Sequence, residues 1–300
     1  MATARMLTIG SRGSQLALWQ ARFVAGRLEN RGVATRIEII RTTGDRWQTA
    51  SLVQAGGKGL FTREIEEALL AGAIDLAVHS LKDLPTETPE GLALAAMPER
   101  ENPFDAMVGG TLAGLKEGAR VGTSSSRRAA QLRMLRPDLT IEPIRGNVDT
   151  RLRKRREGEF DAILLAVAGL RRLGLDGEIA QIFTADEICP APGQGALAIE
   201  TRAGDEAFAI CGGLNDQPTS QAVLCERTVL KELGGGCQLP VGAFAEMRGA
   251  ILHVTAAVVA PDGSKRLRAE GEGEDAGELG RLIAAELIER GAREILAASV

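Results

Sequence analysis

Two short segments carry residues whose types and spacing could do chemistry. GGGCQLPVG, residues 234–242, places Cys237 after three glycines, and a thiol on so bare a loop is either incidental or a covalent attachment point. HSLKDLP, residues 79–85, places Lys82 beside Asp83 at the end of a predicted buried strand. A carboxylate beside a cation usually stays ionised, so Asp83 could stabilise a cationic intermediate or accept its proton. A loop salt bridge is the commoner role of such a pair.

Ser/Thr-rich turns open two of the predicted helices. GSRGS, residues 10–14, and GTSSSRR, residues 122–128, each present backbone N–H groups at a helix N-terminus, which attracts anions. A serine at this position is about as often only a structural N-cap. Nearby arginines favour carboxylate binding, because a guanidinium group pairs bidentately with a carboxylate. These arginines are Arg12, Arg127, Arg128, Arg145 and Arg151.

The charge of the chain is unevenly distributed. The formal net charge is -4 at pH 7, yet residues 120–156 contain eleven Arg or Lys and only three acids. This local excess favours a pocket for carboxylates or phosphates. For Lys154, Arg155 and Arg156 a solvated basic face is the simpler interpretation, but not for Arg145. Nucleic acid fits poorly, because seven Phe, two Trp and no Tyr leave few stacking partners and the overall charge is acidic.

Other chemistries find little support. The four cysteines form no C-x-x-C pair and there are only two histidines, so we predict no metal site and no Ser-His-Asp triad. His79 is better explained as a structural residue at the end of a strand. GGKGLF, residues 56–61, lacks the first glycine and the final Ser or Thr of a phosphate-binding loop, so we interpret it as a mobile glycine loop carrying Lys58. No G-x-G-x-x-G follows the first strand, so the sequence gives no support for a dinucleotide cofactor.

Strands and helices must position these residues, and they alternate along two thirds of the chain. We expect helix 14–32 to begin with Ser14 as N-cap and to end at Gly32, and helix 125–137 to be stopped by Pro137. The alternation predicts parallel sheets covered by helices, in two similarly built α/β units. The other expected elements are strands 6–10, 35–40, 75–80, 119–125, 140–144 and 161–167 and helices 62–72 and 147–158.

Two proline-containing joints divide the chain. Residues 97–103 form one and residues 189–195 the other, after which strand 196–200 is expected to return to the first sheet. Two crossings between two domains would make a hinge over a central cleft. A third unit follows, with a helix, strands 241–247, 251–260 and 266–272, and a final helix. We therefore predict domain 1 at 1–97 plus 195–213, domain 2 at 102–190, and domain 3 at 217–300.

Neither a secretory signal nor a membrane span is visible. The first residues lack a long apolar segment, and the longest apolar run, 162–170, is far below the ~20 residues of a membrane span. We expect a cytoplasmic protein with reduced cysteines.

The motifs together resemble one enzyme family along nearly the whole chain. Eight segments match in family order: IGSRGSQLALWQA, GGKGLFTREIE, AVHSLKDLPTE, NPFDAMV, VGTSSSRRAAQL, RGNVDTRLRKR, PAPGQGALAIE and GGGCQLPVGA. The sequence is similar to the porphobilinogen deaminases, also called hydroxymethylbilane synthases. The resemblance implies three α/β domains, the first two like periplasmic binding proteins with a hinge and central cleft, the third a small α/β domain with a three-stranded sheet.

The resemblance also implies the chemistry. Such an enzyme is a transferase of haem biosynthesis that joins four porphobilinogen molecules head to tail, releases ammonia at each addition, and starts on a dipyrromethane cofactor. It implies a thioether from Cys237 to that cofactor, a catalytic role for Asp83 and a monomer. It further implies that these residues contact cofactor or substrate: Arg12, Ser14, Lys58, Ser80, Lys82, Thr123, Ser124, Ser125, Arg127, Arg128, Arg145, Arg151, Arg172 and Gln194. Ser126 departs from the apolar residue usual in the family, which bears only on local packing.

Charge complementarity supports the same conclusion independently. Each porphobilinogen carries two carboxylates, and desolvated carboxylates need cationic partners. The alternative is a hinge-type small-anion-binding module without catalysis, which would leave HSLKDLP and GGGCQLPVG without a role. We expect no partner other than porphobilinogen and the growing polypyrrole chain, and neither nucleic acid nor membrane.

Overall fold

The computed structural model describes residues 6–42, 62–236 and 239–298. Two of the predicted site residues, Lys58 and Cys237, lie outside the described residues. Contacts divide the chain into two compact units, and each is described by itself. Unit 1 comprises Met1–Arg100 and Ala196–Ser220, and unit 2 comprises Glu101–Gly195 and Gln221–Val300. Two of the three divisions fall at the predicted proline-containing joints and the third follows Ser220, whereas the expected hinge and cleft stay predictions.

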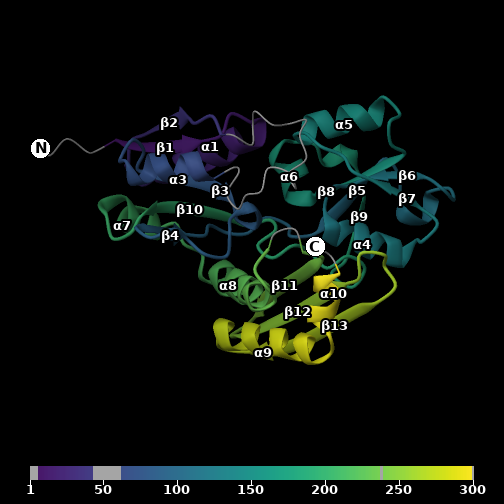
Figure 1. Ribbon diagram of the computed structural model, residues 1–300. Coiled ribbons are helices and arrows are strands. Elements are labelled where there is room, and N and C mark those ends of the chain that lie inside the picture. Colours follow the sequence, from purple (N-terminus) through teal and green to yellow (C-terminus); the bar gives the residue numbers. More distant parts are fainter. Residues whose placement is uncertain (1–5, 43–61, 237–238, 299–300) are drawn as a thin grey trace, which may run out of the picture. The chain divides into compact units, whose positions relative to one another are not determined.

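Unit 1 contains a five-stranded sheet with the order β2-β1-β3-β10-β4 (Figure 1). Its strands are β1 (Leu7–Ser11), β2 (Thr35–Ile39), β3 (Leu76–Ser80), β4 (Leu92–Ala96) and β10 (Leu197–Arg202). Strand β1 is parallel to β2 and β3, whereas β10 is antiparallel to both β3 and β4. The return of the chain after the second joint is thus confirmed. The expectation of an all-parallel sheet is wrong, because the returning strand enters between β3 and β4 in the opposite direction.

Helices cover both faces of this sheet. On one face α1 (Gln15–Glu29) packs against apolar residues of β1 and β3, and α7 (Glu206–Gly212) packs against β4 and β10. On the other face lies α3 (Arg63–Leu70). The N-cap of α1 is Ser14, as predicted, and its Oγ accepts a hydrogen bond from the Ala17 N–H. The predicted C-cap is wrong by two residues: Asn30 ends the helix, and Gly32 follows in the left-handed conformation that redirects the chain.

Unit 2 contains a second five-stranded sheet with the order β7-β6-β8-β5-β9. Its strands are β5 (Asp105–Val108), β6 (Arg120–Gly122), β7 (Thr140–Glu142), β8 (Ala162–Ala166) and β9 (Ile179–Ile182). Strand β6 is parallel to β7 and β8, while β5 is antiparallel to β8 and β9, so this sheet is also mixed. Helix α4 (Ser126–Leu135) covers one face, and α5 (Val148–Arg156) and α6 (Val167–Arg172) cover the other. The expected strand to residue 167 ends one residue earlier, where α6 begins.

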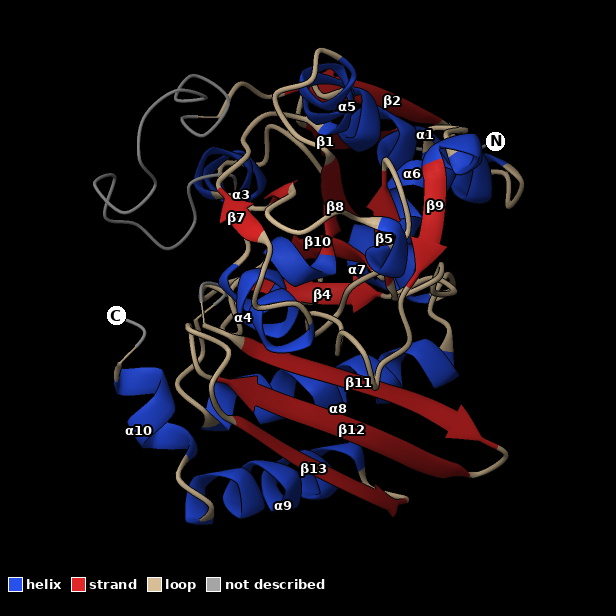
Figure 2. Ribbon diagram, turned by 90° about the vertical axis from the view of Figure 1, so that its right-hand side faces the viewer, coloured by secondary structure: helices blue, strands red, loops and turns tan. Residues whose placement is uncertain are grey.

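The remainder of unit 2 is a three-stranded antiparallel sheet, β11-β12-β13, with helices on one face (Figure 2). Its elements are α8 (Gln217–Glu232), β11 (Val241–Arg248), β12 (Ile251–Val259), β13 (Arg266–Gly273), α9 (Ala276–Glu289) and α10 (Ala292–Ala297). Helix α8 begins in the unit 1 segment and continues through unit 2. A Cβ at Gly280 of α9 would lie 2.7 Å from the Cys225 carbonyl oxygen of α8, so this glycine lets the two helices approach closely.

The predicted fold class, α/β with two sheets of one kind and a small third sheet, is confirmed. No helix in the described part of the chain combines the length and the apolar character needed to span a membrane.

Candidate active site

Asp83 lies at the carboxyl end of β3, on the 3-10 turn Leu81–Asp83. Leu81 is fully buried and anchors the turn, while Asp83 is exposed. Among the residues that the structure describes, none makes a hydrogen bond or ion pair with the Asp83 carboxylate. The loop salt bridge considered from the sequence is therefore not formed there. The carboxylate is held on a rigid strand end with its oxygens open to an incoming cation.

A buried glutamine supports the residue that precedes this turn. The Gln20 amide of α1 is 3% exposed and donates a 2.8 Å hydrogen bond from Nε2 to Oγ of Ser80. Because β1 runs parallel to β3, the Arg12 turn that follows β1 lies at the same sheet edge as Ser80. Gln20 was not predicted from the sequence, although an amide on the apolar face of a predicted helix is a usable signal.

The opposite side of β3 carries a buried pair. Nε2 of His79 lies 3.1 Å from Oε2 of Glu200 on β10, and both side chains are nearly inaccessible. His79 thus has the structural role that we predicted at the strand end. Burial raises the pKa of nearby Glu66 on α3, and the charge of Glu200 adds to the effect. The His79–Glu200 pair links β3 to β10 at the end of β3 that leads into the Asp83 turn.

In unit 2, Asp105 of β5 lies between the two arginines that open α4. Its carboxylate accepts 2.7 Å and 3.3 Å hydrogen bonds from Arg127 and a 2.8 Å hydrogen bond from Nε of Arg128. All three side chains are almost wholly buried. Although burial opposes ionisation, the two guanidinium groups hold the pKa of Asp105 well below its usual range. The role of this carboxylate was not predicted from the sequence, although an acid within the apolar segment NPFDAMV is a usable signal.

Both arginines make further contacts inside unit 2. Arg127 donates a 2.7 Å hydrogen bond to the Cys189 carbonyl, and Arg128 donates to the Leu164 carbonyl and to Oε1 of Gln194. The Gln194 amide, fully buried, donates in turn to Asp105 and to the Pro103 carbonyl. The predicted residues Arg127, Arg128 and Gln194 are therefore brought together in one buried network around Asp105.

The hydroxyl groups of the turn before α4 hold the turn itself. Oγ1 of Thr123 accepts from the Ser125 N–H, Oγ of Ser124 donates to the Ile144 carbonyl, and Oγ of Ser125 caps α4 by accepting from the Arg128 N–H. The structural role weighed for these serines is present, and their contact with a ligand stays a prediction.

The remaining predicted arginines of unit 2 follow β7 and β8. Arg145 and Arg151 are half-buried, and Nε of Arg151 donates to the Gly146 carbonyl at 2.7 Å. Arg172, in the last turn of α6, donates to the Gly195 carbonyl at 2.6 Å. Burial lowers the pKa of Arg172 to about 10, so it remains cationic at neutral pH. By contrast, Arg156 pairs with Glu178 and Lys154 lies 3.9 Å from Glu159, as expected for a solvated face.

The sequence matches two family models that together cover most of the chain. Residues 7–209 match the model described as porphobilinogen deaminase, dipyromethane cofactor binding domain, and residues 220–289 match porphobilinogen deaminase, C-terminal domain. The chain belongs to the porphobilinogen deaminase family. It forms hydroxymethylbilane from porphobilinogen and uses a dipyrromethane cofactor. A binding module without catalysis is therefore not supported.

Relatives in this family match over almost their full length. The chain is 50% identical over 298 residues to the porphobilinogen deaminase of Roseiflexus sp. (strain RS-1), covering 97% of this chain and 98% of the relative. It is 48% identical to that of Thiobacillus denitrificans, covering 97% of each chain. Among solved structures, the methionine binding protein MetQ is 11% identical, with 70% of this chain and 89% of that chain covered and a TM-score of 0.45. We draw no argument from so distant a likeness.

The residues of unit 2 suit the four carboxylates of a dipyrromethane. The predicted set offers guanidinium and hydroxyl donors from the start of α4, from the turn before α5 and from α6. Asp105, the buried acid beside Arg127 and Arg128, is already neutralised by these two arginines, and Glu101 near Arg172 is paired with Arg171. Donors without uncompensated acids are the environment that carboxylates require.

The three described cysteines are poor nucleophiles. Burial raises the pKa of Cys189, Cys211 and Cys225 to about 12 each, and the thiolate is the reactive form. We therefore predict that iodoacetamide at pH 8 leaves all three unmodified in the folded protein and modifies them once the chain is unfolded. Peptide mapping by mass spectrometry measures this, and rapid labelling of any of them in the native state would contradict it.

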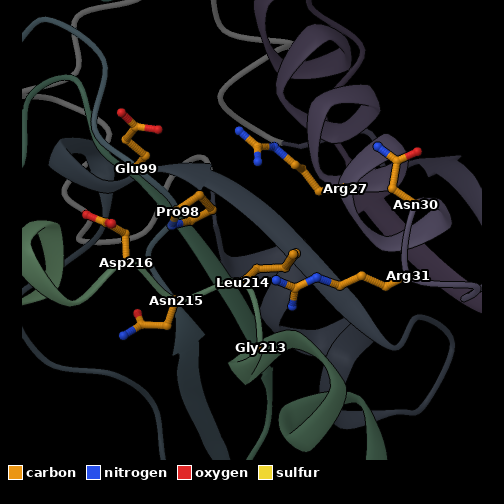
Figure 3. Close-up of a pocket in the computed structure, with 9 residues that line it drawn as sticks. All are labelled: Arg27, Asn30, Arg31, Pro98, Glu99, Gly213, Leu214, Asn215 and Asp216. Carbon is orange, nitrogen blue, oxygen red and sulfur yellow. The ribbon is translucent and has the colours of Figure 1, made fainter.

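A separate pocket lies in unit 1 and contains none of the predicted site residues (Figure 3). Its volume is about 380 Å³. Arg27 and Arg31 extend into it from the end of α1, and Glu99 and Asp216 line the opposite side. None of these side chains belongs to the buried network around Asp105 or to the Asp83 turn.

Within the described part of the chain, no group of His, Cys, Asp or Glu is arranged to hold a metal ion.

Proposed function

We propose that Asp83 is the catalytic group of this porphobilinogen deaminase. The observation that supports it is the exposed carboxylate on the Leu81–Asp83 turn, bound by none of the described residues, at the carboxyl end of β3. Loss of ammonia from porphobilinogen leaves positive charge on the pyrrole system. A fixed carboxylate stabilises that charge and orients the pyrrole N–H groups, because it needs no reorganisation when the charge develops.

We propose that the predicted binding residues act as a set of carboxylate ligands. In unit 1 these are Arg12, Ser14, Ser80 and Lys82, with Lys58 outside the described residues; in unit 2 they are Thr123, Ser124, Ser125, Arg127, Arg128, Arg145, Arg151, Arg172 and Gln194. Guanidinium groups pair with carboxylates in a planar fork, so they orient the pyrroles as well as bind them. The dipyrromethane, when bound, supplies the terminal pyrrole carbon to which porphobilinogen adds.

We propose that Cys237 carries the cofactor. It lies outside the described residues, but the segment that leads to it is described. Helix α8 ends at Glu232, and the Gly235 N–H then donates a 2.8 Å hydrogen bond to the Leu230 carbonyl. Gly234 and Gly235 both have positive φ, at 113° and 70°, which only glycine adopts readily. The predicted glycine cap therefore ends α8 and turns the chain away from the helix axis at Gly235, two residues before the cysteine.

Intact mass tests the attachment. The purified protein is expected to exceed its sequence mass by one dipyrromethane, and Cys237→Ser is expected to remove the excess. Cys225→Ser is the matched control, because Cys225 is fully buried on α8 and keeps the excess mass. Excess mass in Cys237→Ser, or none in the wild-type protein, would refute the assignment.

We further propose three domains at the boundaries predicted from the sequence, a monomer, and a cytoplasmic location. The burial of three thiols and the composition support a protein of a reducing compartment. Sedimentation of the purified protein measures the oligomeric state.

A further inference from the structure

A buried carboxylate on α8 lies outside the predicted site. Glu226 is 0% exposed, and its two oxygens bind two different segments of unit 2. Oε2 accepts a 2.7 Å hydrogen bond from the Gly193 N–H, and Oε1 accepts a 2.8 Å hydrogen bond from the Ala245 N–H of β11. A carboxylate in an apolar core is costly unless such donors satisfy it, so this one side chain joins helix, sheet and the 189–195 joint.

The joint is held at three consecutive residues. Gly193 is bound by Glu226, the next residue Gln194 is bound through its side chain to Asp105 and Arg128, and the Gly195 carbonyl accepts from Arg172. A Cβ at Gly195 would lie 2.3 Å from the Glu101 carbonyl oxygen, so only glycine fits where these two backbone segments approach each other. The position of the Gln194 side chain therefore depends on how the backbone is held at Gly193 and Gly195.

We propose that Glu226 is a positioning residue for the carboxylate-binding arginines. It fixes the Gly193–Gln194 backbone, which keeps the Gln194 amide between Asp105 and Arg128, and the amide in turn orients the Arg128 guanidinium. The same helix leads to the predicted attachment residue Cys237. Helix α8 thus bears on the geometry of the cationic site through Glu226. The inference rests on the proposed roles of Arg128 and Gln194.

The two hydrogen bonds require a carboxylate and not only a polar side chain. The Gly193 and Ala245 groups that bind Glu226 are both N–H donors, so each needs an oxygen. In Glu226→Gln one of those oxygens becomes an NH₂ group, which would face another donor, while shape and volume are kept. The substitution therefore releases either Gly193 or Ala245 without opening a cavity.

The test is a double-mutant cycle between Glu226→Gln and Gln194→Ala. Rates are expressed per cofactor-loaded molecule, with loading counted by intact mass. We expect Glu226→Gln to lower kcat/KM for porphobilinogen about 10-fold, since small displacements of positioning groups cost 10–100-fold. Because Glu226 acts through Gln194, the double variant should lie within about twofold of Gln194→Ala alone.

Two controls separate positioning from stability. Val229→Ala, one turn further along α8 in the same core, lowers stability without touching the joint, and Glu289→Gln removes an exposed carboxylate of α9. Both should keep kcat/KM near wild type per folded molecule. If Glu226→Gln and Val229→Ala lowered kcat/KM equally, the inference would be overturned while the proposed binding role of Gln194 would stand. The same follows if the two reductions in kcat/KM multiplied in the double variant. Full activity of Gln194→Ala would overturn the inference and the proposed binding role of Gln194 together.

Discussion

Replacing Asp83 by asparagine is expected to lower kcat for porphobilinogen roughly 10³-fold and to leave the fold unchanged. The side chain keeps its size but loses its charge, so it no longer stabilises the cation formed when ammonia leaves. Stability should be nearly unaffected, because the carboxylate is exposed and bound by none of the described residues. Consumption of porphobilinogen and formation of the linear tetrapyrrole measure turnover, and circular dichroism measures the fold.

Glu87→Gln is the matched control for this variant. Glu87 is another exposed carboxylate a few residues along the same connection, and its removal should leave kcat within about twofold, as for an ordinary surface change. If Asp83→Asn turned over porphobilinogen at the wild-type rate, Asp83 would have no part in the mechanism. A loss of activity accompanied by unfolding would instead assign it a structural role.

Replacing Asp105 by asparagine is expected to destabilise the protein by about 3–5 kcal/mol, the usual cost of removing one partner from a buried ion pair. Two guanidinium groups, Arg127 and Arg128, would remain buried without their common counter-ion. Urea unfolding at pH 7 measures the difference. Glu157→Gln is the control, since its pair with Arg153 on α5 is largely exposed and screened by water; it should shift the midpoint far less. Equal shifts of the urea midpoint in the two variants would contradict a larger contribution of the buried pair to stability.

The same carboxylate makes a specific contribution to acid stability. The pKa of Asp105 in the folded protein lies below its value of about 3.9 in an unfolded chain. Its stabilising effect is therefore complete above about pH 5 and is lost only as the pH falls below the unfolded pKa toward the folded one. We expect the free energy of unfolding of Asp105→Asn to lack this decrease at acid pH. Between pH 6 and 8 its pH dependence should be the same as that of the wild-type protein. Unfolding curves at pH 7, 5 and 3 measure it.

Local patterns account for what could be predicted of the fold. Ser14 was recognisable as an N-cap because a cap is decided within three or four residues. Asp83 was recognisable because an apolar strand ends directly before it. The glycines after α8 were recognisable as a cap for the same reason.

Tertiary structure alone decided how distant segments meet. Strand β10 enters the first sheet between β3 and β4, more than a hundred residues from either partner, so no local pattern predicts its direction. Asp105 contacts arginines 22 and 23 residues away, and Glu226 contacts a joint 33 residues away. Burying a charge is costly, so such carboxylates persist only where the fold brings donors to them. The sequence by itself determined the family, the catalytic candidate and most of the strands, but not β4, β5 and β9. The folded chain decided which buried carboxylates hold the arginines in place, because that depends on contacts between residues far apart in the sequence.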